Sequence, residues 1–87
     1  MRTETMIRQG TPQQQIHAMH RAGLTPSRVC LQLWVTGCVW YDVTSVYRLN
    51  KVFGGFLSEE LYVLCRSETG RTCGIMAEDQ RIVAVDA

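Results

Sequence analysis

The sequence lacks the features that direct a chain to a membrane or out of the cell. Its longest near-continuous apolar run, from Cys38 to Tyr41, is far shorter than the roughly 20 residues of a membrane-spanning helix. The first residues contain no apolar stretch of the kind found in secretory signal peptides. Neither sign of charge predominates, because nine Lys and Arg residues are balanced by eight Asp and Glu residues. We therefore expect a cytoplasmic protein that does not contact membranes.

Motifs for catalysis and for cofactor binding are also missing. No serine lies in a nucleophile elbow, and Gly54-Gly55 follows a predicted helix, whereas phosphate-binding glycines precede one. The acidic pairs Glu59-Glu60 and Glu78-Asp79 fall in predicted turns, where carboxylates are normally solvated. With 87 residues the core is thin and leaves little room for a preorganised pocket. We expect neither an enzyme nor a cofactor.

The four cysteines do not have the spacing of a zinc site. Zinc ligands usually come in pairs two to four residues apart, whereas seven residues separate Cys30 from Cys38 and Cys65 from Cys73. Free cysteines are commonly buried as small apolar residues. We therefore expect buried thiols and no metal. A disulfide or a metal at Cys65 and Cys73 stays open.

The N-terminal half carries the signals of three helices. A polar, flexible N-terminal segment over residues 1–10 precedes a single domain over residues 11–87. Thr11-Pro12 followed by Gln14 provides an N-cap, a proline at the first position and a capping box. Thr25-Pro26 repeats the signal for a second helix. A third helix is predicted over 43–53 and ends at Gly54-Gly55.

The C-terminal half alternates with the period of strands. Leu61 to Ser67 and Arg71 to Ala77 are predicted to form a hairpin over 61–77, with Gly70 at the loop position that requires positive φ. This register places Cys65 opposite Cys73. A last strand covers 81–85. The predicted fold is α+β and winged-helix-like, with three N-terminal helices followed by a small three-stranded antiparallel sheet.

One stretch resembles a known family. Residues 42–57, which read Asp-Val-Thr-Ser-Val-Tyr-Arg-Leu-Asn-Lys-Val-Phe-Gly-Gly-Phe-Leu, look like the recognition helix and following turn of winged helix-turn-helix transcription regulators. Residues 22–28 are similar to a helix opening of ferric-uptake-type repressors, but the metal ligands of those repressors are absent. The resemblance covers roughly residues 16–77. It implies sequence-specific DNA binding, usually as a dimer, through Ser45, Tyr47 and Arg48.

A transcriptional regulator that binds double-stranded DNA is the first functional hypothesis. Helix 43–53 would enter the major groove, and hairpin 61–77 would contact the backbone. Hydroxyl and amide groups can read bases, and arginine and lysine can bind phosphates or guanine. The expected DNA contacts are Thr44, Ser45, Arg48, Asn50, Lys51, Arg66 and Arg71.

The alternative is a small protein-interaction module without DNA, an inhibitor or adaptor of the kind that mobile elements encode. It rests on the aromatic and thiol-rich residues 38–41 and on apolar residues on both faces of the last strands. Residues 82–85 have no polar face, and an apolar edge strand favours association. Both hypotheses therefore predict a homodimer through strand 81–85.

Overall fold

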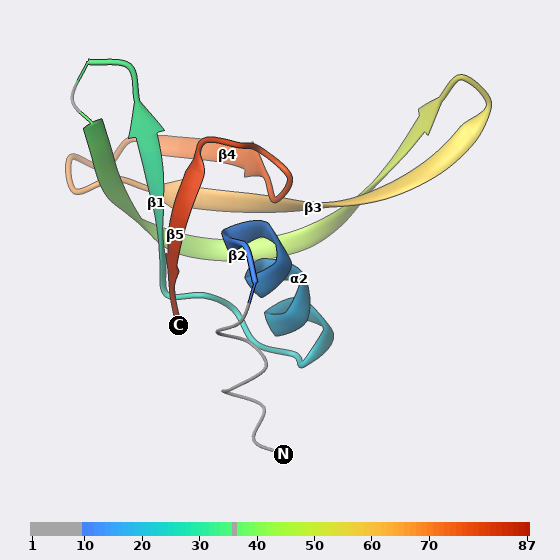
Figure 1. Ribbon diagram of the computed structural model, residues 1–87, viewed down its shortest axis with the longest axis horizontal. Coiled ribbons are helices and arrows are strands. Elements are labelled where there is room, and N and C mark those ends of the chain that lie inside the picture. Colours follow the sequence, from blue (N-terminus) through green and yellow to red (C-terminus); the bar gives the residue numbers. More distant parts are fainter. Residues whose placement is uncertain (1–9, 36) are drawn as a thin grey trace.

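The computed structural model describes residues 10–35 and 37–87, without the side chains of Lys51 and Phe53. Within these residues it has one helix and five strands (Figure 1). Of the predicted N-terminal segment 1–10, all residues but Gly10 lie outside the described residues. The elements are α2 (Pro12–Arg21), β1 (Arg28–Leu33), β2 (Gly37–Phe53), β3 (Phe56–Arg66), β4 (Thr72–Met76) and β5 (Ile82–Asp86).

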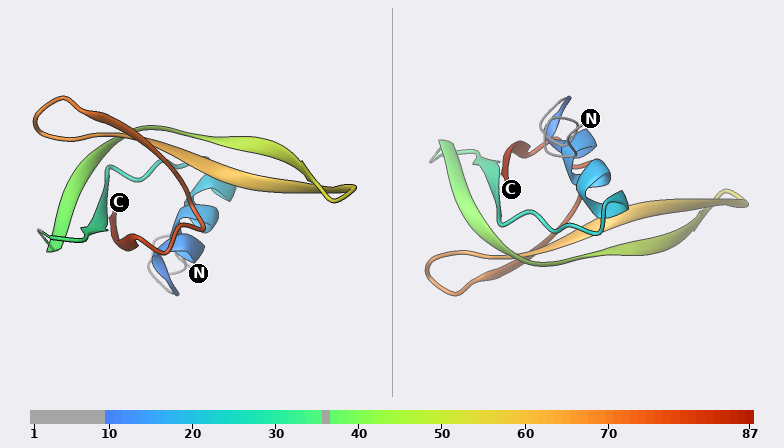
Figure 2. Two further views of the ribbon diagram at one scale, coloured as in Figure 1. Left: turned by 90° about the horizontal axis from the view of Figure 1, so that it is seen from above. Right: turned by 90° about the horizontal axis from the view of Figure 1, so that it is seen from below.

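The five strands form one antiparallel sheet in the order β4-β3-β2-β1-β5. The sheet is strongly curved, and α2 lies on its concave side (Figure 2). The two sheet edges are β4 and β5, which are distant in the order of strands.

The long strand β2 changes its partner part-way along its length. Residues 37–42 pair with β1, and residues 42–53 pair with β3. The register shifts between Val43 and Ser45, so Thr44 is the extra residue of a β-bulge, which bends a strand. Beyond the bend, β2 and β3 continue as a two-stranded ribbon, residues 49–60, which we call the arm (Figures 1 and 2).

The core lies between α2 and the concave face of the sheet. From α2 the buried side chain of Ile16 packs into it, and Gln13 ties the helix to the β4–β5 connection by donating to the carbonyl of Asp79 at 2.9 Å. The strands contribute alternate residues, as expected for a sheet with one covered face. The strand residues of this cluster are Val29, Leu31, Leu61, Val63, Cys65, Ile75 and Ile82, with Ala77 beside them.

Three local predictions are confirmed. The first helix begins with the predicted capping box, in which the Thr11 hydroxyl accepts from the Gln14 amide at 3.2 Å and the Gln14 side chain accepts from the Thr11 amide at 3.0 Å. The β3–β4 hairpin has the predicted loop, with Gly70 at φ 84°, and pairs Cys65 with Cys73. The last strand, β5, begins one residue later than expected and ends at Asp86.

The predicted fold class is wrong. Over the described residues the structure has one short helix and a five-stranded sheet, not three helices followed by a three-stranded winged-helix-like sheet. Where the second helix was expected, β1 pairs with β2 and β5. The apolar residues Val29 and Leu31 suit an alternating strand pattern, and both are buried. Pro26 is buried rather than the first residue of a helix.

The predicted third helix, 43–53, is the second half of β2. Val43, Thr44, Val46 and Val52 are β-branched, and such side chains pack well on a pleated sheet. Gly54 and Gly55 have φ values of 56° and 84°, as required of both central residues in a two-residue type I′ hairpin turn. The glycine pair therefore turns a hairpin and does not end a helix. The described part of the chain contains no helix with the length and apolarity to cross a bilayer.

Candidate binding groove

The first half of β2 has one paired edge and one open edge. Residues 38–41 pair with β1, and β3 joins β2 only from Asp42 onward. Within the described residues, no strand pairs with residues 38–41 on the side away from β1. That side opens onto a groove of about 700 Å³. The groove therefore presents the backbone of a strand, and we call it the edge groove.

The pairing pattern tells which backbone groups face the edge groove. The amide of Val43 donates to the carbonyl of Ser27 at 2.9 Å. Bonding directions alternate along an antiparallel strand, so Val39 and Tyr41 are directed toward β1 as Val43 is. The N–H and C=O groups of Cys38 and Trp40 then point to the open edge. A strand laid in the groove would meet these groups.

Trp40 and Arg28 form the aromatic and cationic side of the edge groove. The guanidinium carbon of Arg28 lies 4.9 Å from the Trp40 ring centroid, a cation–π contact. Arg28 also bonds Asp86 on β5 at 3.2 Å. Trp40 is 37% exposed, so a partner can still reach the ring. These contacts hold an indole and a guanidinium in place before any partner binds.

The opposite wall is the turn between β3 and β4. Its residues Ser67, Glu68, Thr69 and Arg71 line the edge groove. The Ser67 hydroxyl accepts from the Arg71 amide at 3.2 Å and contacts the Thr69 hydroxyl at 3.0 Å. The turn is therefore ordered by its own hydrogen bonds. Among the groove residues, Arg28 and Arg71 are cationic and Glu68 is anionic.

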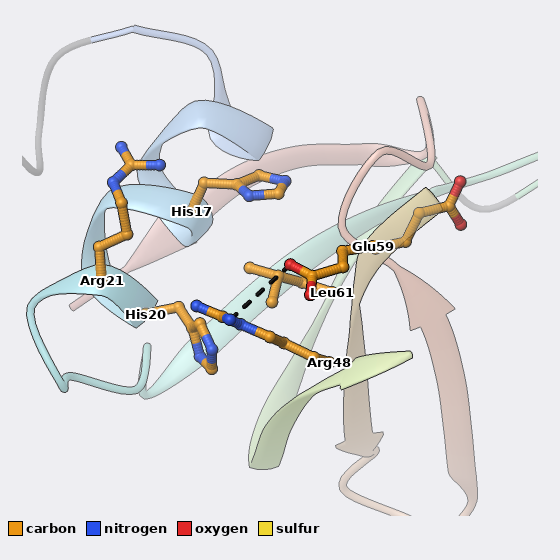
Figure 3. Close-up of a pocket in the computed structure, with 7 residues that line it drawn as sticks. His17, His20, Arg21, Arg48, Glu59 and Leu61 are labelled. Carbon is orange, nitrogen blue, oxygen red and sulfur yellow. Dashed lines mark ion pairs between the residues drawn. The ribbon is translucent and has the colours of Figure 1, made fainter. Parts of the chain in front are cut away.

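A second, smaller cleft lies between α2 and the base of the arm (Figure 3). It measures about 140 Å³ and brings His20 and Arg21 of the helix near Arg48 and Glu59 of the sheet. Arg48 and Glu59 form an ion pair at 3.7 Å, with both side chains more than half exposed. His17, also in the lining, pairs with Glu78. Two of the four His and Arg side chains that line this cleft, His17 and Arg48, thus pair with carboxylates.

The predicted DNA contacts do not gather on one surface. Arg48 and Asn50 are paired with Leu61 and Glu59, on the face of β2 that also carries core residues, while Ser45 lies on the opposite face. Thr44 is the bulge residue, and its hydroxyl donates to the Leu64 carbonyl at 3.0 Å. The side chain of Lys51 lies outside the described residues, Arg66 ends β3, and Arg71 is in the edge groove.

Sequence reasoning found part of the edge groove and missed the rest. The segment 38–41 was already the basis of the interaction-module hypothesis, and it forms one wall. Arg28 was missed because it was expected on a helix, far from Trp40. The sequence signal for Arg28 is its spacing from Asp42, because a hairpin that pairs Leu33 with Gly37 places residue 28 opposite residue 42.

The thiols and carboxylates do not form a larger cluster. In the part of the chain that the structure describes, no three His, Cys, Asp or Glu side chains gather as metal ligands would. Cys30 and Cys38 are neighbours, and burial together with the nearby Cys38 thiol raises the pKa of Cys30.

Comparison with protein-family models, curated proteins and solved structures finds no match to this chain.

Proposed function

We propose that this protein is a small, non-enzymatic interaction module that binds an extended segment of a partner protein in the edge groove. The partner segment would add a strand beside residues 38–41 of β2. Strand addition takes affinity from main-chain hydrogen bonds and specificity from pockets for alternate side chains. The observation that carries the proposal is the open edge of β2 facing a groove of about 700 Å³.

The residues around this edge support the proposal. Trp, Tyr and Arg are the residue types that most often dominate binding energy at protein interfaces. Here Trp40, Tyr41, Arg28 and Arg71 surround the same groove. The stacking of Arg28 on Trp40 reduces the side-chain entropy that binding would cost.

A double-stranded DNA partner has less support. The strand conformation of residues 43–53 removes the helix that would have entered the major groove. The expected contact residues lie on different faces and turns. The net charge of +1 provides little attraction to phosphates. The experiment that follows therefore also measures binding to a DNA duplex, which would favour the DNA hypothesis.

The test uses peptides selected from a random displayed library against the full chain. Each selected peptide is titrated by fluorescence anisotropy against the unchanged protein, Cys38→Pro and Cys38→Ala. Proline removes the Cys38 amide that faces the edge groove, and alanine controls for loss of the thiol. We expect Cys38→Pro to weaken binding at least tenfold and Cys38→Ala to change it less than threefold, since one lost hydrogen bond costs about 1–3 kcal/mol.

A second part of the experiment tests the hydrogen bonds made by the peptide backbone. N-methylation at alternate peptide residues should abolish binding in one phase of the alternation and leave it intact in the other, because only alternate amides face β2. Failure to recover any peptide, or equal affinity for Cys38→Pro and the unchanged protein, would refute the proposal. Salt-sensitive binding of a mixed-sequence duplex that Arg48→Ala weakens would favour the DNA hypothesis instead.

We also propose that two copies of the chain associate through β5. This strand is an edge of the sheet, and Val83 on it is 39% exposed. Light scattering after gel filtration should give a dimer mass, and Val83→Lys should give a monomer because charged side chains block edge pairing. Val35→Lys, at a residue 93% exposed in the turn between β1 and β2, is the matched control. A monomer of the unchanged chain at micromolar concentration would exclude this association.

A further inference from the structure

Two cysteines face each other across the β3–β4 ladder. Cys65 and Cys73 are direct partners in the antiparallel register. Cys65 is fully buried in the core and donates its thiol proton to the Val63 carbonyl at 3.9 Å, while Cys73 is partly exposed. Both thiols are free. The proposed function uses neither of them.

The position of this pair in the ladder suits a bond under modest strain. The Ser67 amide donates to the Arg71 carbonyl, and the Ala77 amide donates to the Leu61 carbonyl. Because bonded and non-bonded pairs alternate, Cys65 and Cys73 form a hydrogen-bonded pair, with Cα atoms typically about 5.5 Å apart. Disulfides bridge Cα separations of about 4.4–6.8 Å. The Cβ atoms of a hydrogen-bonded pair lie farther apart than a relaxed disulfide prefers, which favours an easily reduced bond.

The other two cysteines provide an internal comparison. Cys30 is the partner of Trp40, and Cys38 is the partner of Gln32, so the two thiols lie diagonally across β1 and β2. Diagonal partners typically have their Cα atoms about 7–8 Å apart, beyond the usual range for a disulfide, and the Cys30 and Cys38 thiols are in hydrogen-bond contact without being joined. The chain therefore carries one directly opposed pair and one diagonal pair.

We propose that Cys65 and Cys73 are a site of reversible disulfide formation by thiol–disulfide exchange with a small disulfide such as oxidised glutathione. The partly exposed Cys73 thiolate attacks one glutathione sulfur, which forms a mixed disulfide and releases one glutathione thiolate. The Cys65 thiol then loses its proton to solvent, and its sulfur attacks the Cys73 sulfur. The second glutathione leaves. Two protein thiols are oxidised, and one glutathione disulfide is reduced to two glutathiones.

The different exposure of Cys73 and Cys65 determines which of the two sulfurs reacts first. Cys73 is the partly exposed thiol of the pair, so it is the one that oxidised glutathione can reach first. Burial raises the pKa of Cys65 to about 12, with the nearby Cys73 as the smaller cause. Cys65 therefore enters second, from within the core, and ring closure is expected to accelerate as the pH rises.

Closure would join β3 to the edge strand β4 beside the turn that forms one wall of the edge groove. Any effect on partner binding rests on the proposed function. The chemistry of the pair does not, because it is measured without a partner. A failure of one can thus be told from a failure of the other.

The test exposes the full chain to a series of ratios of oxidised to reduced glutathione, blocks remaining thiols with N-ethylmaleimide, and measures the intact mass. We expect two of the four thiols to become unreactive, without a glutathione adduct, and peptide mapping to join residues 65 and 73. The double variant Cys30→Ala/Cys38→Ala should oxidise in the same way. Its oxidised form should melt about 3–10 °C higher than its reduced form, and dithiothreitol should reverse the shift.

The control is Cys65→Ala/Cys73→Ala, which keeps only the diagonal pair and should retain both thiols at the same ratios. Three results would overturn the proposal: four reactive thiols at every ratio, a persistent glutathione adduct on Cys73, or a bond that joins residues 30 and 38. Each of these three results can be detected in the unchanged chain by thiol counting and peptide mapping, so the test of the proposal does not depend on the folding of a variant.

Discussion

The two halves of β2 show how the same strand can be used in two ways. Residues 37–42 pair with β1, and residues 42–53 pair with β3, so each half has one edge without a strand partner among residues 10–35 and 37–87. The open edge of the first half faces a wall built from the β3–β4 turn. The second half runs out into the arm, where Val52, Phe56 and Leu57 are 70–80% exposed.

The difference teaches that an open edge becomes a binding site through its surroundings. An edge in solvent is mainly a risk of aggregation, and charge, twist or short length limits that risk. An edge with walls and fixed aromatic side chains can select a partner. The bulge at Thr44 separates the two halves, because it bends β2 where its partner changes.

The largest expected contrast is between two leucines that each pair with one half of β2. Leu31 pairs with Val39 and is 2% exposed, whereas Leu57 pairs with Val52 and is 70% exposed. Leu31→Ala should lower the free energy of unfolding by about 2–5 kcal/mol, because it leaves a cavity in the core. Leu57→Ala should change it by less than about 0.5 kcal/mol. Urea denaturation checks both, and a similar loss for the two variants would show that the arm is packed.

A second contrast lies between the two edges of the first half. Val39→Pro removes an amide directed toward β1, and Cys38→Pro removes one directed to the open groove. Proline is tolerated in strands mainly where its missing N–H faces solvent. Val39→Pro should therefore destabilise the chain by about 2–3 kcal/mol more than Cys38→Pro. Thermal unfolding provides the comparison. If Cys38→Pro were the more damaging change, the assignment of the open edge would be wrong.

The junction of the halves should respond to alkaline pH. Cys65 pairs with Val43 there, and burial raises its pKa to about 12 from an ordinary value near 9. The folded chain favours the neutral thiol, so the stabilisation is complete below pH 9 and is lost as the pH rises toward 12. Under reducing conditions the free energy of unfolding should fall by about 1 kcal/mol from this thiol between pH 8 and 10. Cys65→Ala should remove that part of the slope; an unchanged slope would place its source elsewhere.

The sequence predicted the elements whose signals are local. The capping box at Thr11 and Gln14 and the glycine of the β3–β4 loop each fix a few neighbouring dihedral angles. Both lie where predicted. The pairing of Cys65 with Cys73 followed from the loop, since loop length sets the register of a hairpin.

The elements that were misread depend on distant partners. Thr25-Pro26 has the form of a helix start, but the residues after it pair with β2, where Arg28 is opposite Asp42, and with β5, more than 50 residues away in the chain. In β2 the apolar residues Val43, Val46 and Tyr47 fit a helical spacing, while β-branching and the Gly54-Gly55 turn favour a strand. A glycine pair fits a helix end and a hairpin equally well, and tertiary pairing decided between them.

Only one wall of the edge groove could be predicted from the sequence, because the other wall is brought to it by pairing between distant segments. Residues 38–41 were noted for their aromatic and thiol content, and they line the edge groove. Its other wall comes from residues 67–71, and no pattern in the sequence joins the two segments. Their approach follows from β3 ending at Arg66 while β2 continues toward Gly37.

The smallest expected effect concerns the second half of β2. Arg48 was predicted to contact DNA, and it pairs with Glu59 at 3.7 Å, with the two side chains 58% and 59% exposed. Solvent screens such a pair, so Arg48→Ala should cost less than about 0.5 kcal/mol of unfolding free energy, with a smaller loss in 0.5 M salt. Glu59→Gln is the matched change on the partner and should have a similar effect. A loss above 1 kcal/mol in urea denaturation would mean that the cleft beneath α2 holds the arm to the body, and the two halves of β2 would then be less independent than their pairing indicates.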